Sequence, residues 1–330
     1  MKEIVGRRVE LLAENRELLH KAFFLENGLM TVVAGAAFAE KNKTADPEFI
    51  KECRNLLKKK KGPFSEIRGN NELLISAKMA LSGNPEQYLD DVIGIYNKLQ
   101  SGKFFGSGHR VLAAASICDA KKANDTERLI EKTEAIIRGM KASHPFLTSD
   151  EDTGFAVLLA MTDKNVEQIL AELEESYQYL KKDFVLHDNA VYSLAQVLTT
   201  YDGDCKEKCE KALEFFEAFK STGFKYGKDH ELPSLGILVN LGPEIGEIVA
   251  EVIEAAESLK GHKGFGTLDM SKHTRLMIGA MIVSSAYAED TTVANASVAS
   301  GALSLLIAQQ AAVMAVIAST SAAAASSSSH

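Results

Sequence analysis

Phenylalanine recurs at a nearly constant interval along this chain, and this spacing constrains the fold more than any other feature. Successive positions lie 38 to 41 residues apart, and they are Phe64, Phe105, Phe146, Phe184, Phe224 and Phe265. Such a period indicates one structural unit copied in series. A polar cluster follows each Phe. We expect each ring to pack between successive units, so that its loss costs stability.

The stretch from His187 to Phe224 shows what one unit contains. Residues 189–201 (NAVYSLAQVLTTY) carry no charge, and a turn containing Gly203 follows them. Residues 204–220 then place apolar side chains at three-and-four spacing, on a helix whose other face is Lys and Glu. The unit is therefore predicted to be an αα-hairpin, with a short uncharged helix, a tight turn and a longer amphipathic helix.

The neighbouring units repeat this alternation. Helices without a charged face are predicted at 72–82, 109–121, 153–163, 189–201, 232–241 and 272–288. Amphipathic helices are predicted at 85–100, 125–142, 165–182, 204–220 and 244–260. A less regular hairpin pairs 23–40 with 47–61, and an N-terminal helix lies near 2–20. No segment alternates as a β-strand does, so the fold class is all-α.

The contrast between the two helix types predicts two layers. A helix without a charged face must be covered on all sides, so these helices should form an inner layer and the amphipathic ones an outer layer. Tandem αα-hairpin repeats with this layering form a strongly curved α-solenoid or, if the curvature closes, an α/α toroid. We expect a single helical-repeat domain over 1–318 and an Ala/Ser-rich flexible tail over 319–330.

Charge and cysteine content narrow the class of protein. The chain has 37 basic and 45 acidic residues and a net charge of −8, which disfavours binding to nucleic acid. The basic run from Lys58 to Lys61 is expected to end a helix, where cations complement the dipole. The first residues lack the apolar core of a secretory signal, and four cysteines in 330 residues suit a reducing cytoplasm.

Residues 291–329 contain no charge, and 293–318 would be long enough to span a bilayer. This segment contains several polar side chains, including Gln309 and Gln310, and lacks a flanking basic cluster. It also falls where the outer helix of the last hairpin is expected. We therefore favour a buried helix that closes the array, or a surface for homo-oligomer formation, over membrane insertion.

A polar cluster at the start of each inner helix is the candidate site. Equivalent positions in equivalent repeats lie at one end of the array, so these side chains should converge on one mouth. The candidate ligand-binding residues are Asn71, His109, Asp150, Asp152, His187, Asp188, Asp229, His230 and His273. The four histidines of this set, His109, His187, His230 and His273, are the candidate ligands of a divalent metal. The alternative is helix capping, which explains Asn and Asp but not His.

Two segments carry a resemblance to a known family. HPFLTSDEDTGFAVLLA (144–160) and LLIAQQAAVMAVIA (305–318) resemble the corresponding segments of a bacterial family catalogued as domain of unknown function 4003. The resemblance extends over most of the chain. It implies a bacterial, Gram-positive, cytoplasmic protein and brings no known activity or ligand. GFGTLDMSKHT (264–274) is similar in style to α/α toroids of the prenyltransferase and terpene-cyclase type. However, the chain has no tryptophan and no aspartate-rich box.

Two functions remain open from the sequence. The first is a binding or scaffold protein that holds a protein, peptide or small-molecule ligand at the polar mouth. The second is a metal-dependent α/α-toroid enzyme that uses the His and Asp cluster there. No Walker A, GxGxxG, GxSxG or HExxH motif is present, which favours the first function.

Overall fold

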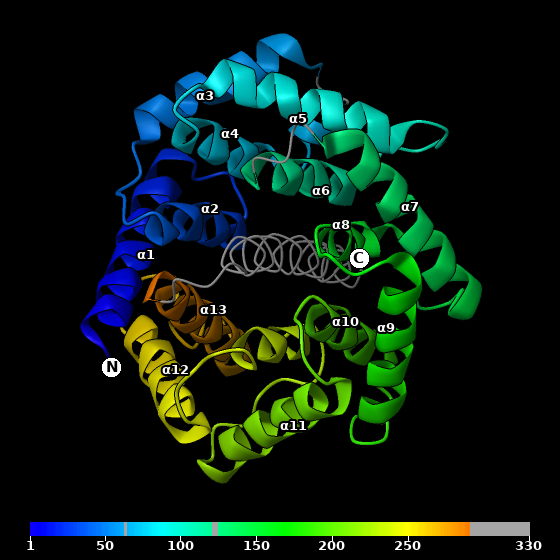
Figure 1. Cartoon of the computed structure of the whole chain (residues 1–330). Helices are drawn as coiled ribbons and strands as arrows, with labels where there is room; N and C mark the ends of the chain where they lie inside the picture. Colours follow the sequence, from blue (N-terminus) through cyan, green and yellow to red (C-terminus); the bar gives the residue numbers. More distant parts are fainter. Residues whose placement is uncertain (63–64, 121–124, 291–330) are drawn as a thin grey trace, which may run out of the picture.

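The computed structural model of the chain describes residues 1–62, 65–120 and 125–290, and these contain helices and no β-strand (Figure 1). The prediction of an all-α fold is confirmed. The outer helices are α1 (Glu3–Ala22), α3 (Pro47–Lys60), α5 (Pro85–Gln100), α7 (Thr126–Ser143), α9 (Val166–Leu180), α11 (Cys205–Ser221) and α12 (Ile245–Lys260). The inner elements are α2 (Gly28–Glu40), α4 (Glu72–Leu81), α6 (Gly108–Asp119), α8 (Thr153–Ala160), α10 (Asp188–Thr199), the 3-10 helix η4 (Leu232–Leu238) and α13 (Lys272–Asp290). Two short 3-10 turns, η1 (Glu66–Arg68) and η3 (Asp150–Asp152), precede α4 and α8.

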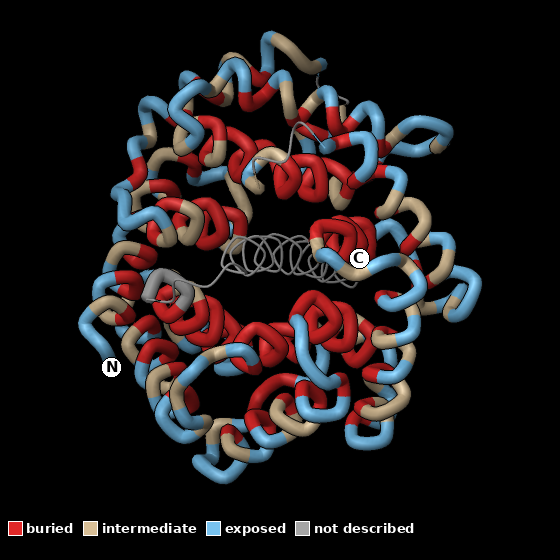
Figure 2. The backbone as a smooth tube through the Cα atoms, viewed as in Figure 1, coloured by how far each residue is buried: buried red, intermediate tan, exposed pale blue. Residues whose placement is uncertain are grey.

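Burial separates the two layers as the sequence predicts. All eight residues of α8 are buried, because it has no charged face and is surrounded by other helices. The following outer helix, α9, buries only one stripe, which includes Ile169, Leu173 and Tyr177. Figure 2 shows this difference over the molecule, with buried residues along the inner elements and exposed residues along the outer helices. The hydrophobic core therefore lies between the layers.

The two ends of the described chain are in contact. Helix α1 packs against both α12 and α13, although they are separated by most of the sequence (Figure 1). The Arg16 guanidinium donates a hydrogen bond of 3.1 Å to the carbonyl of Lys263, and the Lys2 backbone N–H donates one of 2.8 Å to Glu251. The first hairpin is thus covered by the last one.

The pairing of helices differs from the predicted hairpin, because inner elements pack on the outer helix that precedes them more than on the one that follows, as α8 does on α7 and α10 on α9. Helix α2 packs on α1 and α4, and α3 packs on α4, so residues 23–40 do not pair with 47–61. The reason is that the chain reverses directly after α1, where Phe23 is buried, as it does after each later outer helix. The N-terminal helix is therefore the outer partner of α2, and not an addition to the array.

The inner element predicted at 232–241 is a seven-residue 3-10 helix and not an α-helix. Pro233 lies in its first turn and has no backbone N–H to donate. Gly236 lies against α10, where an added Cβ would come within 2.7 Å of a Val197 methyl group. Both residues favour a short, narrow element that packs closely on its neighbour.

The repeated phenylalanines do not all pack between hairpins. Phe184 and Phe265 are buried and Phe224 is half-buried, but Phe105 is 84% exposed and Phe146 is 98% exposed. The prediction is therefore wrong for these last two, and Phe64 lies outside the described residues.

Other side chains replace the two exposed rings. In the loop before α8, the neighbouring Leu147 packs against the core in place of Phe146. The loop before α6 is held by polar contacts, because Gln100 and Arg110 both donate hydrogen bonds of 2.8 Å to the carbonyl of Phe105.

The C-terminal segment at 293–318 and the tail at 319–330 lie outside the described residues. Within the described ranges, no helix has both the length and the apolar character needed to cross a membrane.

Candidate functional site

A cavity of about 460 Å³ opens where the N-terminal ends of α6, α8, α10 and η4 meet. We call it the mouth cavity. Its titratable lining residues are His109, Glu151, Asp152, His187, Asp229 and His230. Five of these six belong to the set predicted from the sequence. No lysine or arginine of the described chain lines it, so its walls are acidic.

Asp152 is the most buried carboxylate of the mouth cavity, with 6% of its surface exposed. Its Oδ2 accepts a hydrogen bond of 2.7 Å from the Ser149 backbone N–H, and its Oδ1 accepts one of 2.7 Å from Gln196 Nε2. The first of these bonds is half of a capping box with Ser149, so capping does account for Asp152. Burial raises the pKa of Asp152, because it penalises the charged form.

His187 and Asp229 form a pair on adjacent hairpins. His187 Nδ1 lies 2.9 Å from Asp229 Oδ1, which fixes the orientation of the imidazole at the start of α10. Both side chains line the mouth cavity, and Asp229 remains largely exposed. Neither residue caps its helix through its side chain, since α10 has no side-chain cap bond at His187.

The other two histidines of the mouth cavity have fewer partners. His109 Nδ1 is buried and has no hydrogen-bond partner among the described residues. Burial lowers the pKa of the His109 imidazole, against the opposing effect of Glu151, so the neutral ring is favoured. His230 Nε2 lies 3.1 Å from Glu231 Oε1, without the geometry of a hydrogen bond. Both rings therefore have a nitrogen that is free to bind a ligand.

Four predicted residues lie elsewhere. Asn71 donates a hydrogen bond of 2.9 Å to the carbonyl of Gly108, and Asp188 accepts one of 2.9 Å from the Tyr177 hydroxyl. Asp150 is bound by the Arg110 guanidinium, at 2.5 Å and 2.6 Å to its two oxygens. Asn71 and Asp150 therefore link neighbouring hairpins, and Asp188 links α10 to α9.

The fourth, His273, lines a separate cavity of about 600 Å³. That cavity lies beside the mouth cavity and shares Asp229 with it. Its walls combine aromatic residues with lysines and carboxylates in equal number, so it shows no excess of either charge.

The four histidines predicted as metal ligands are not assembled. Among the described residues, no three His, Cys, Asp or Glu side chains form a group that could hold a metal ion. His273 lies in the neighbouring cavity, apart from the other three. The four histidines are thus divided between two cavities, and divalent metal binding stays a prediction.

Sequence reasoning missed Glu151, Asn189, Ser193 and the exposed Phe146 as lining residues. A signal was present for two of them. Asn189 and Ser193 are four residues apart on α10, so they share one polar face of an otherwise apolar inner helix. Phe146 could not be identified, because the sequence does not show that Leu147 occupies the inward position.

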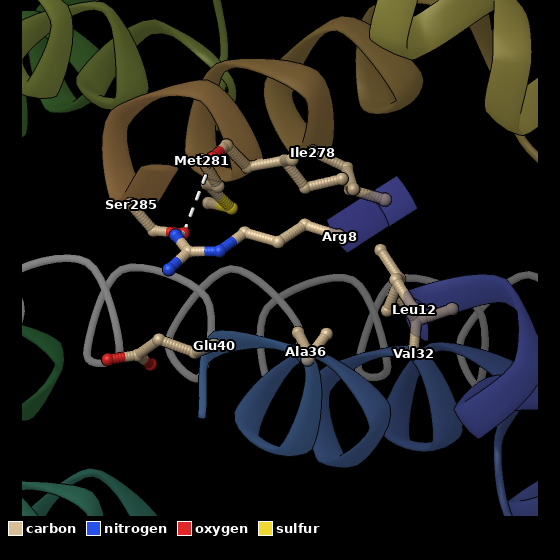
Figure 3. A pocket seen from close by; sticks show the side chains of 10 residues that line it. Arg8, Leu12, Val32, Ala36, Glu40, Ile278, Met281 and Ser285 are labelled. Atoms are coloured by element: carbon tan, nitrogen blue, oxygen red, sulfur yellow. Dashed lines mark hydrogen bonds between the residues drawn. The ribbon is translucent and has the colours of Figure 1, made fainter. Parts of the chain in front are cut away.

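A third cavity, much smaller than the other two, lies between α1, α2 and α13, and Figure 3 shows its lining. Its volume is about 40 Å³, which leaves room for water but not for an organic ligand. The Arg8 guanidinium extends into it and donates a hydrogen bond to Ser285 Oγ, while Glu40 and apolar side chains such as Leu12 and Met281 form the other walls.

Comparison with known proteins identifies a family. No match was found among curated proteins or solved structures. The model of one family, described as protein of unknown function (DUF4003), matches residues 16–312. This range covers nearly the whole chain and all four elements around the mouth cavity. The chain therefore belongs to the DUF4003 family.

Proposed function

We propose that this protein is a closed α/α toroid of tandem hairpins that binds a small organic cation in the mouth cavity. The observation that carries the proposal is the convergence of Glu151, Asp152 and Asp229 on one cavity, into which no lysine or arginine of the described residues projects. The contacts of α1 with α12 and α13 support closure. Closure fixes the loops that carry these residues.

The chemistry of the walls suits a cation with an apolar part. A buried carboxylate such as Asp152 interacts strongly with an ammonium or guanidinium group, because little water screens it. Phe146 and Phe155 provide aromatic faces for a cation, and Leu147 and Leu186 provide apolar surface for an alkyl chain. The volume of about 460 Å³ falls within the range of ligand cavities in proteins.

Calorimetric titration of the full chain tests this proposal. The probes are agmatine, putrescine and choline, with succinate as the anionic comparison. We expect the amines to bind and succinate not to bind. Asp152→Asn should weaken amine binding by about 10- to 100-fold, because a charged hydrogen bond contributes roughly 1.5–3 kcal/mol.

Asp188→Asn is the matched control. Like Asp152→Asn it removes one carboxylate at the start of an inner helix, here α10 in place of α8, but Asp188 does not line the mouth cavity. It should leave amine affinity within about twofold, since exposed charges act weakly at a distance. Binding of succinate in preference to the amines, or equal effects of the two variants, would contradict the proposal.

Three further expectations from the sequence stay with this proposal. All four cysteines, Cys53, Cys118, Cys205 and Cys209, are free, which supports residence in a reducing cytoplasm. A bacterial source stays a prediction. Homo-oligomer formation through residues 293–318 stays a prediction.

A further inference from the structure

Large apolar side chains project into solvent on the loops around the mouth cavity. They occupy three consecutive connections from an outer to an inner helix, between α5 and α6, α7 and α8, and α9 and α10. We call them the apolar rim: Phe104, Phe105, Phe146, Val185 and Leu186. Each is at least 69% exposed. Exposed apolar clusters of this kind mark interaction surfaces.

The apolar rim borders the mouth cavity. Phe146 and Leu186 line the cavity themselves. The loop that carries Phe104 and Phe105 is joined to the next loop by Arg110, which binds the Phe105 carbonyl at 2.8 Å and the Asp150 carboxylate. A ligand in the cavity that extends outward must therefore meet apolar side chains.

We propose that the occupant is a peptide segment that places a basic side chain in the mouth cavity and flanking large apolar side chains on the apolar rim. This inference rests on the proposed function and names the class of its ligand. Charge complementarity carries it, since three carboxylates and no lysine or arginine line the mouth cavity in the described part of the chain. An amine without apolar neighbours would leave the rim in water.

Two other occupants suit the charges less well. An anionic bilayer would face the carboxylates of the mouth cavity and a protein with a net charge of −8. A second copy of the chain would bring its own Glu151 and Asp229 to the same apolar surface, and like charges at an interface weaken association. A basic, apolar peptide meets neither form of repulsion.

The experiment compares two probes by calorimetry on the full chain. One is Nα-acetyl-lysinamide, and the other is an acetylated five-residue peptide amide with a central lysine flanked by Phe and Leu. We expect the peptide to bind at least tenfold more tightly, because burial of one large apolar side chain strengthens binding by about that factor. The same peptide with Glu in place of Lys should not bind.

Two double variants, each of which loses one Phe and one Leu, test whether the tighter binding of the peptide comes from the apolar rim. Phe146→Ser with Leu186→Ser should abolish the tenfold advantage of the peptide. Phe24→Ser with Leu268→Ser removes exposed apolar side chains that do not line the mouth cavity and should leave it intact. All four positions are largely exposed, so both variants should fold, which circular dichroism checks.

The outcomes separate this inference from the proposed function. If both probes bind equally, the inference fails and cation binding stands. If neither probe binds, both fail. Loss of vesicle co-sedimentation or of dimer formation in the Phe146 and Leu186 variant, with peptide affinity unchanged, would assign the rim to a membrane or to a second copy and overturn the inference.

Discussion

Asp152 is held by the fold at a cost in stability. Its carboxylate is buried beside Gln196, whose Oε1 has no hydrogen-bond partner among the described residues. A raised pKa means that the native state binds a proton more tightly than the unfolded chain does. The ionised form therefore lowers the free energy of unfolding at neutral pH. This cost disappears as the pH falls through the raised pKa towards the ordinary value of 3.8.

Asp152→Asn should accordingly stabilise the protein while it weakens cation binding. The amide can accept from the Ser149 N–H and donate to Gln196 Oε1 after a flip of that side chain. We expect the free energy of unfolding at pH 7 to rise by about 1 kcal/mol. Urea unfolding measures it, and the gain should shrink as the pH is lowered. If the variant is less stable than the parent at pH 7, the Asp152 carboxylate stabilises the native state and the prediction is wrong.

For single residues, the sequence predicts where a polar residue lies in the array better than it predicts which way its side chain points. The polar clusters behind each Phe do lie at the starts of the inner elements, because the repeat places them there. Whether a side chain enters the mouth cavity depends on its rotamer and on the nearest partner. Asp188 turns to Tyr177 and Asp150 to Arg110, whereas Asp229 turns to His187. The orientation of each side chain depends on tertiary contacts that cannot be read from the sequence.

Each element was predictable where its periodicity is strong. The outer helices begin and end within about two residues of the predicted bounds, since their apolar stripe and their capping residues agree. Asn165 and Asp204, for example, both cap their helices. The predictions fail where tertiary packing overrides the local pattern. The 3-10 helix η4 owes its geometry to Pro233 and to the close approach of Gly236 to α10.

The connecting loops differ in what their phenylalanine contributes, and this yields a prediction. Phe265 is fully buried, so Phe265→Ala should lower the free energy of unfolding by about 3–5 kcal/mol. Phe105→Ala should change it by less than about 0.5 kcal/mol, because that ring is exposed. Chemical denaturation of both variants measures the difference. Similar losses at the two positions would show that the Phe105 ring is packed in solution.

At the scale of the molecule, the contact between the first and last hairpins decides how the chain unfolds. In an open array the terminal repeats lack one neighbour and unfold first. Here α1 packs on α12 and α13, and we call this contact the seam. Each of the two terminal hairpins therefore has a neighbour on its outer side. We expect cooperative unfolding of the two ends.

Gly264 provides a test of this seam. It has a φ of +86°, and an added Cβ would overlap the Arg16 guanidinium, which must then release the Lys263 carbonyl. Gly264→Ala should therefore speed hydrogen exchange in both α1 and α12. Gly223→Ala is the control, since its φ is +80° but its Cβ would meet nothing within 4 Å. Both variants carry about 1–2 kcal/mol of backbone strain. Exchange that rises equally in the two variants would exclude a role for the Arg16 contact.

The 3-10 helix gives the mouth cavity walls of unequal stiffness. Its i→i+3 hydrogen bonds have poorer geometry than those of an α-helix, so we expect η4 to open more readily than α6, α8 or α10, although all seven of its residues are buried. Pro233, within η4, lines the mouth cavity, and His230 lies just before the helix. The η4 side of the mouth cavity should therefore fluctuate more in position than the sides formed by α6, α8 and α10. A ligand larger than the resting volume would enter on that side, and the timing of its exit would be set there.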